Sequence, residues 1–130
     1  MISFLKKSIL AFLLCNFSYV QGYDAVAQAH LIYQSLSSFI AANVQYASYE
    51  VLDFKPVQNL LKSQKSILNI HAFNQGTKTL LEVMEEYRQD SIKKKNHFIL
   101  QKRQAEITRC RKLIEIYTRI IKIIKEMGKM

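Results

Sequence analysis

The chain has few residues that interrupt regular structure or cross-link a fold. Its 130 residues include one proline, three glycines, two cysteines and no tryptophan. So few turn-forming residues exclude a β-rich fold with many tight connections and favour long helices. A disulfide scaffold is also excluded, because Cys15 lies in a segment that we expect to be removed. The remaining Cys110 stands at helical spacing among apolar residues and is predicted to be buried; an intermolecular disulfide is the alternative.

Sequence patterns typical of catalysis, metal binding and phosphate binding are missing too. The three histidines, His30, His71 and His97, are far apart and match neither HExxH nor a Cys/His ligand cluster. No serine stands in a GxSxG or SxxK context, and there is no glycine-rich phosphate loop. We therefore predict a protein that is not an enzyme, with no cofactor, no metal site and no evident small-molecule substrate.

The first 22 residues have the layout of a signal peptide. Lys6 and Lys7 precede an apolar run at residues 8–15, and a more polar stretch ends at Gly22. The apolar run is too short to cross a bilayer, which favours cleavage near Gly22 over an uncleaved N-terminal membrane anchor. In either case we expect the rest of the chain to be exported, periplasmic or extracellular, because basic residues stay on the cytoplasmic side.

Residues 23–130 are predicted to form a single all-α domain, either a helical hairpin or a three- to four-helix bundle with a long C-terminal helix. Apolar residues recur every three or four positions in four segments, at about 24–54, 57–74, 78–96 and 97–127. The polar residues 89–96 contain neither Gly nor Pro. One continuous helix over residues 78–127 is therefore favoured, and a short loop at 89–96 is the alternative.

Several residues mark the expected helix boundaries. Asp24 suits the N-cap of the first helix. Lys55-Pro56 is expected to stop that helix, and Pro56 also suits the first turn of the next. Gly76 offers a left-handed C-cap for the second helix, and Thr79 with Glu82 has the spacing of a capping box.

The last segment is the most periodic part of the chain. One apolar row consists of Ile107, Cys110, Ile114, Tyr117, Ile121 and Ile124. A second row consists of Leu113, Ile116, Ile120, Ile123 and Met127. We expect this broad stripe to be buried against the first two helices or a partner, and burial in a lipid interface is the alternative. Accordingly, Ile114→Asp is predicted to unfold or dissociate the bundle, since it would bury an unpaired charge.

Positive charge is concentrated in the last forty residues. Residues 23–90 contain five Lys/Arg and seven Asp/Glu, whereas residues 91–130 contain twelve Lys/Arg and three Glu. Such a region attracts an acidic protein surface, an anionic membrane or nucleic acid. Nucleic acid is disfavoured, because Tyr117 falls on the apolar row and export removes the chain from most nucleic acid. The residues predicted to form a partner- or anion-binding face are Lys112, Arg119, Lys122 and Lys129.

The opening of the first helix carries a resemblance to a known group of proteins. Gln21-Gly22-Tyr23-Asp24-Ala25 follows the signal peptide and begins a helix rich in Ala and Gln. This layout resembles that of small exported helical proteins of bacterial conjugation and type IV secretion systems. The predicted function is that of a small, non-enzymatic interaction or structural protein of a bacterial envelope that binds a protein partner or itself. The alternatives are a peripheral membrane-binding protein using the basic C-terminal helix, and a periplasmic component of a conjugation or secretion apparatus.

Overall fold

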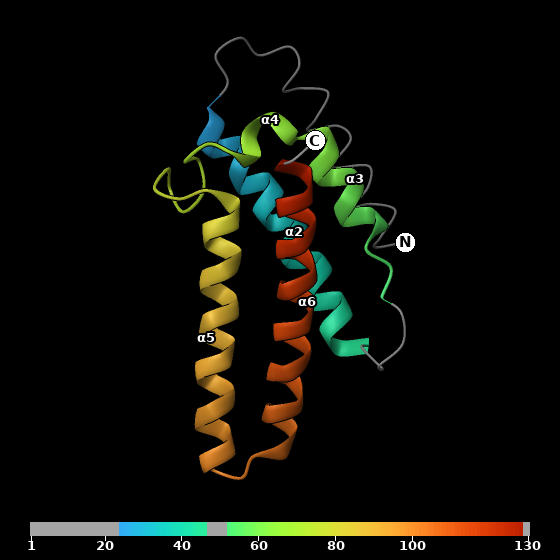
Figure 1. Cartoon of the computed structure of the whole chain (residues 1–130), viewed down its shortest axis with the longest axis vertical. Helices are drawn as coiled ribbons and strands as arrows, with labels where there is room; N and C mark the ends of the chain where they lie inside the picture. The colour runs from blue at the N-terminus through green and yellow to red at the C-terminus, as the bar shows by residue number, and fades with distance from the viewer. Residues whose placement is uncertain (1–23, 47–51, 129–130) are drawn as a thin grey trace.

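The computed structural model describes residues 24–46 and 52–128, which are mostly helical (Figure 1). The helices are α2 (Ala25–Tyr46), α3 (Lys55–Ser63), α4 (Lys65–Leu68), α5 (Leu80–Leu100) and α6 (Gln104–Gly128). Within this part of the chain, β structure is limited to one isolated bridge between Phe73 and Lys78. The all-α prediction is therefore confirmed, whereas the predicted signal peptide, residues 1–22, lies outside the described residues.

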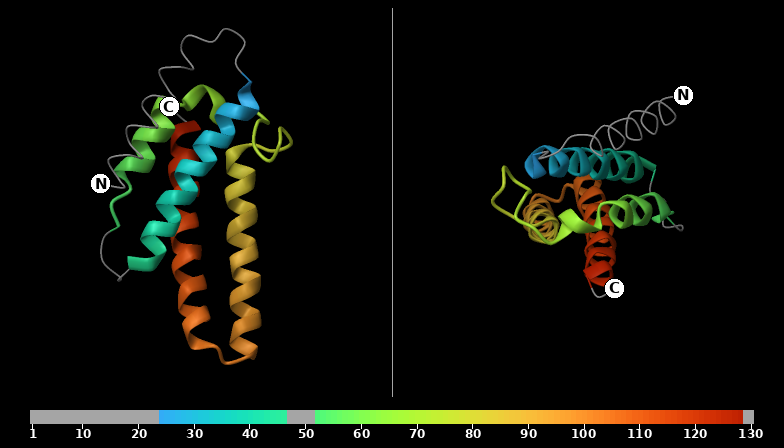
Figure 2. Two further views of the ribbon diagram at one scale, coloured as in Figure 1. Left: turned by 180° about the vertical axis from the view of Figure 1, so that it is seen from behind. Right: turned by 90° about the horizontal axis from the view of Figure 1, so that it is seen from above.

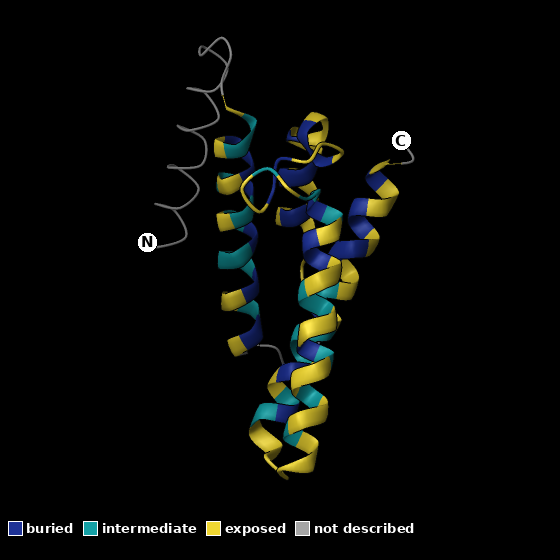
Figure 3. Cartoon of the chain, turned by 90° about the vertical axis from the view of Figure 1, so that its left-hand side faces the viewer, coloured by how far each residue is buried: buried dark blue, intermediate teal, exposed yellow. Residues whose placement is uncertain are grey.

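Helices α5 and α6 form a long antiparallel hairpin, and α2 and α3 lie against one end of it (Figures 1 and 2). Helix α6 packs chiefly against α5 and also contacts α2 and α3. The other end of the hairpin extends beyond α2 and is largely exposed (Figure 3). We call this projecting part, residues 92–112, the arm, and the remainder the base. None of the helices within 24–46 and 52–128 has both the length and the apolar character needed to cross a bilayer.

The core lies in the base, where side chains from four helices meet. Leu36 of α2, Leu61 of α3, Leu80 of α5 and Ile120 of α6 are each completely buried. The isoleucine stripe of the last helix contributes most of the α6 side of this core, so its predicted burial against the first two helices is confirmed.

The centre of that stripe differs from the prediction. Ile116 and Ile120, in the second apolar row, are almost completely buried, whereas Ile114 and Tyr117 in the first row are only partly buried. The physical reason is that α6 is covered by α5 on one side and by α2 and α3 on another, so the row between these neighbours is the most enclosed. Ile114 lies where the base gives way to the arm.

The first predicted helix is shorter than its periodicity suggested. Helix α2 ends at Tyr46 instead of residue 54, residues 47–51 lie outside the described part, and Leu52–Phe54 are not helical. The Asp53 carboxylate accepts a hydrogen bond from the Lys55 N–H at 3.0 Å, which turns the chain into α3. Phe54 is buried with its ring centre 5.4 Å from that of Phe39. Pro56 occupies the first turn of α3, as predicted.

The second predicted helix, residues 57–74, is broken and also ends early. Gln64 separates α3 from α4, and α4 ends at Leu68. The Gln64 side chain is buried in the base, where its Oε1 accepts a hydrogen bond from Gln28 Nε2. Ile67 is then buried as well. Gln64 lies on the same buried face as Leu60 and Leu61, four and three residues earlier, so burial of its side chain does not require the break. The break is local: the Gln64 backbone departs from helical geometry with a φ of -117°, and the Ser63 hydroxyl donates to the Leu60 carbonyl at 2.8 Å, a bond that competes with the helical ladder.

Gly76 lies in a loop and does not cap a helix. Phe73 and Lys78 exchange backbone hydrogen bonds of 2.8 and 2.9 Å, closing a turn in which Asn74, Gln75 and Gly76 all have positive φ. The buried Phe73 holds this turn against the base. Gly76 has a φ of 89°, and a Cβ there would lie 3.3 Å from Val26 Cγ2. Both the left-handed conformation and the close approach of α2 therefore require glycine.

Helix α5 begins as predicted and ends at Leu100, where no helix end was predicted. The Thr79 side chain accepts from the Glu82 N–H while the Glu82 carboxylate accepts from the Thr79 N–H, so the capping box is confirmed. The polar residues 89–96 lie inside the helix. The preference for one continuous helix over 78–127 is wrong, because the chain reverses at residues 101–103, where Lys102 has a φ of 56°. Reversal lets α6 bury its isoleucines against α5 in the same molecule.

Candidate interaction surfaces

Three of the four basic residues predicted to form a partner- or anion-binding face, Lys112, Arg119 and Lys122, lie on α6 in the described part of the chain. Lys112 is partly buried at the edge of the arm and Lys122 is exposed on the base, whereas Lys129 lies outside the described residues. Arg119 forms an i,i+4 ion pair with Glu115, at 3.1 Å.

Arg119 is also part of the packing of the base. Its guanidinium lies 5.4 Å from the centre of the Phe54 ring, which places a cation over an aromatic face. The Arg119 side chain therefore helps to hold the segment before α3 against α6. The predicted face is in part a packing contact, and the stronger concentration of charge lies elsewhere.

The arm carries that charge. Its 21 residues contain eight Lys and Arg and a single acidic residue, Glu106, for a net charge of +7. Lys93, Lys94, Arg109 and Arg111 are exposed, and of these Lys94 is paired with Asp90 of the base. The end of the hairpin that carries them projects beyond α2 (Figure 3). Closely spaced like charges repel one another, so the arm is electrostatically unfavourable by itself and gains free energy when an anionic surface approaches.

The tip of the arm combines exposed apolar side chains with cations. Ile99 is 44% exposed and Leu100 is 83% exposed, although both are large aliphatic residues. The Arg103 guanidinium lies 5.2 Å from the centre of the Phe98 ring, and its Nη2 lies 2.6 Å from Glu106 Oε1. These contacts order the reversal between α5 and α6 and leave Ile99 and Leu100 facing the solvent.

A thin apolar seam holds the two helices of the arm together. Ile107 and Cys110 of α6 are each 5% exposed, yet neither belongs to the core of the base. The prediction of a buried Cys110 thiol is confirmed. On the α5 side, Asp90 and Lys94 form an i,i+4 ion pair at 3.2 Å. With so little buried apolar surface, the arm depends on the base for its stability.

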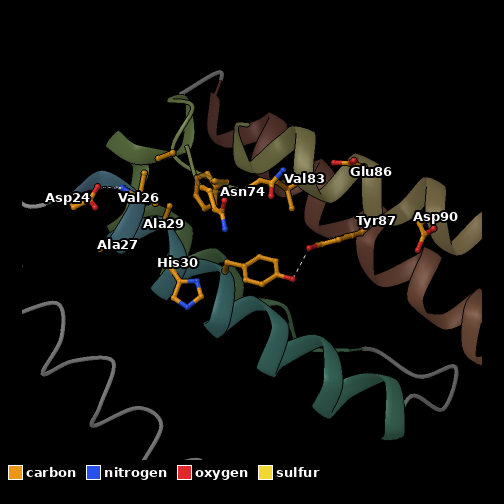
Figure 4. A pocket seen from close by; sticks show the side chains of 14 residues that line it. Asp24, Val26, Ala27, Ala29, His30, Asn74, Val83, Glu86, Tyr87 and Asp90 are labelled. Carbon is orange, nitrogen blue, oxygen red and sulfur yellow. Dashed lines mark hydrogen bonds between the residues drawn. The ribbon is translucent and has the colours of Figure 1, made fainter. Parts of the chain in front are cut away.

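An open cleft of about 720 Å³ lies between α2, the loop before α5 and the first half of α5 (Figure 4). Three carboxylates line it, and each has a structural partner. Asp24 accepts a hydrogen bond from the Val26 N–H at 2.9 Å and so caps α2, as predicted. Glu86 pairs with Lys78, and Asp90 pairs with Lys94. The acidic groups of the cleft thus stabilise the helices around it.

Tyr33 and Tyr87 connect α2 to α5 in this cleft, where their hydroxyl oxygens lie 2.7 Å apart (Figure 4). The ring of Tyr87 also lies 6.0 Å from that of Tyr117 on α6. Burial raises the pKa of Tyr87 well above 10, and the hydrogen bond with Tyr33 adds to the rise. Burial likewise raises the pKa of Tyr117. The raised pKa keeps the Tyr87 phenol protonated at neutral pH, which suits its hydrogen bond with Tyr33 between the helices.

The histidines remain apart in the fold. His30 lines the cleft, His97 lies beside Phe98 in the arm, and the Nε2 of His71 is 3.4 Å from Glu82 Oε1 on an exposed surface. Across the described residues, no three side chains of His, Cys, Asp or Glu come together in a way that could hold a metal ion.

The arm tip and the cleft were not found from the sequence. The concentration of charge was evident, but a continuous helix over 78–127 would have distributed it along a rod with no tip. One signal was present: the apolar Phe98-Ile99-Leu100 is followed at once by the polar Gln101-Lys102-Arg103-Gln104, as at an exposed chain reversal. The cleft had no local signal, because its walls come from three separate segments.

No family model, curated protein or solved structure matches this chain. The resemblance to exported proteins of conjugation and type IV secretion systems therefore stays a prediction based on residues 1–34. The function has to be argued from the arrangement of the chain's own residues.

Proposed function

We propose that this chain is a small exported protein of a bacterial envelope that acts by binding, and that its base presents the arm to an acidic partner surface. The observation that carries this proposal is the isolation of charge: a net +7 is held on a projecting helical hairpin. A charged segment held away from the rest of the molecule can approach a partner without steric hindrance, and its field accelerates the encounter.

Two features of the base support the proposal that the arm binds the partner and the base only supports the arm. The isoleucine stripe of α6 is buried in the core, so it is not exposed as a binding surface. The carboxylates around the cleft are engaged in a helix cap and ion pairs, and the tyrosines there bridge the helices. In the described part of the chain, the net charge of +7 on the arm is not balanced by a negative charge of similar size.

Binding to immobilised polyglutamate tests the proposal, because this polymer imitates an acidic protein surface. The arm variant Arg109→Gln/Arg111→Gln removes two exposed cations, and the base variant Lys62→Gln/Lys122→Gln removes the same charge elsewhere. If each arm cation contributes about 0.2–1 kcal/mol, as exposed ion pairs do, the arm variant should bind about two- to thirtyfold more weakly at low salt. The base variant should bind like the parent. Equal losses for the two variants would show that binding depends only on total charge, and the proposal would be wrong.

Export is tested separately. The full chain, expressed in a bacterial host, should be recovered outside the cytoplasm with Tyr23 as its first residue, as determined by mass spectrometry. Recovery of the intact chain from the cytoplasm would contradict this part of the proposal and leave the arm's binding to be judged by the polyglutamate experiment.

A further inference from the structure

Exposed large apolar side chains are rare in the described part of the chain, and two of the three are adjacent. They are Ile70, Ile99 and Leu100. Ile70 stands alone in the loop after α4, on the base. Ile99 and Leu100 are adjacent, they end α5, and they occupy the point of the arm that is farthest from the base (Figure 1).

Cations surround this apolar tip at a short distance. Lys102 and Arg103 follow it directly in the turn. Lys93 lies seven residues before Leu100 on α5, which corresponds to about 10 Å along a helix. Arg109 lies five residues into α6, or about 8 Å. The arm thus has two aliphatic side chains at its end and a collar of positive charge within about 10 Å, which matches the depth over which interfacial helices sit in the head-group layer.

From this arrangement we infer that the tip docks on an anionic lipid bilayer, with Ile99 and Leu100 inserted between the head groups and the collar on their phosphates. The inference rests on the proposed function and names the partner. The small area of the tip favours a lipid bilayer over a protein as the partner. The end of a two-helix hairpin measures about 10 by 20 Å, or about 200 Å², whereas a stable protein interface buries about 800 Å² on each partner. A bilayer needs only the insertion of the tip and the attraction of the collar.

The absence of tryptophan makes a direct test possible. Leu100→Trp places a single fluorescent reporter at the tip, and Ile70→Trp places one at an exposed position on the base. With vesicles of equimolar phosphatidylglycerol and phosphatidylcholine at low salt, the emission of the Leu100→Trp protein should shift to shorter wavelength. The emission of the Ile70→Trp protein should not shift, and neither protein should respond to vesicles of phosphatidylcholine alone. Equal responses of the two reporters, or no response of the tip reporter, would overturn the inference.

Sedimentation with the same vesicles measures the two contributions separately. Ile99→Ser/Leu100→Ser should weaken partitioning about tenfold, because even half-burial of two aliphatic side chains is worth an order of magnitude. Ile70→Ser should have no effect. Arg109→Gln/Arg111→Gln should weaken partitioning about fivefold for each cation removed, since the attraction acts on every charge near the surface. Circular dichroism of each variant should match the parent, because the altered side chains are exposed.

The polyglutamate experiment separates failure of this inference from failure of the proposed function. If the protein binds polyglutamate through its arm but does not bind the anionic vesicles, the partner is an acidic protein surface and the lipid inference is wrong. If it binds neither, both are wrong. If vesicle binding survives Ile99→Ser/Leu100→Ser unchanged, the tip is not inserted and the inference is also overturned.

Discussion

Replacing Ile120 by alanine tests where the fold has its core. Ile120 is completely buried among α2, α3 and α5, so the substitution removes three carbon groups from a packed interior. At about 0.8 kcal/mol for each group, the lost transfer free energy is about 2.4 kcal/mol. The cavity left behind adds roughly 1 to 2 kcal/mol, because the surrounding helices can collapse only in part. We expect the free energy of unfolding to fall by about 3–4 kcal/mol.

Ile114→Ala is the matched control, because it makes the same chemical change six residues earlier on the same helix. Ile114 is only partly buried and lies outside the apolar cluster of the base. Its replacement should therefore cost about 1 kcal/mol. For the same reason the structure alters the expectation for Ile114→Asp, since a carboxylate at a partly exposed position can reach water and need not unfold the bundle.

Urea unfolding followed by circular dichroism measures both costs. The Ile120→Ala protein should have a clearly lower midpoint with an unchanged slope, and thermal unfolding should occur at least about 12 °C lower than in the parent. Ile114→Ala should shift the transition by only a few degrees. An Ile114→Ala cost equal to or larger than that of Ile120→Ala would refute the greater burial of the second apolar row at the centre of the stripe.

Three further predictions concern the polar and strained parts of the base. Gln28 donates a hydrogen bond to Gln64, but its own Oε1 is buried with no partner in the described structure. Gln28→Leu should therefore lower the free energy of unfolding by about 1–3 kcal/mol, because it leaves the Gln64 amide unpaired. In urea unfolding, Gln28→Leu/Gln64→Leu should recover most of that loss. Gly76→Ala should lower the free energy of unfolding by about 1–2 kcal/mol, since alanine is strained at positive φ and its Cβ would press on α2; an unchanged urea midpoint would contradict the turn geometry. The folded protein holds the Tyr87 proton more tightly than the unfolded chain does, so the contribution of Tyr87 to the free energy of unfolding should be full below pH 10 and should be lost as the pH rises above 10. Urea unfolding at a series of alkaline pH values should show this decline, and Tyr87→Phe should make it shallower.

Local signals predicted the helix starts well. Asp24, Pro56 and the Thr79–Glu82 capping box all act as expected, because each depends on hydrogen bonds or torsion angles within a few residues. The apolar period also predicted that the last helix is buried in the base. These features are specified by short stretches of sequence, so tertiary contacts do not alter them.

Helix ends and the functional surfaces depended on contacts between distant residues. The buried amide of Gln64 has its hydrogen-bond partner in Gln28, 36 residues earlier, a contact that no local pattern indicates. The reversal at Lys102 contains neither glycine nor proline, and it forms because α6 can bury its apolar stripe against α5 and the base. The tip exists only because the chain reverses here. Periodicity alone therefore identified the basic residues but could not place them on a projecting arm.

The same reversal separates the residues that stabilise the protein from those proposed to bind. Ile116 and Ile120 hold the base together, whereas Ile99 and Leu100 contribute little to folding because they are exposed. Exposed leucine and isoleucine carry a cost in solubility, and a cluster of cations carries a cost in repulsion, so neither feature of the tip is explained by stability. If the tip serves binding alone, Ile120→Ala and Leu100→Ser should have additive effects on unfolding, and only Leu100→Ser should weaken vesicle binding once the protein is folded. Strong coupling between the two substitutions would mean that the tip packs against the base in solution, and the separation argued here would not hold.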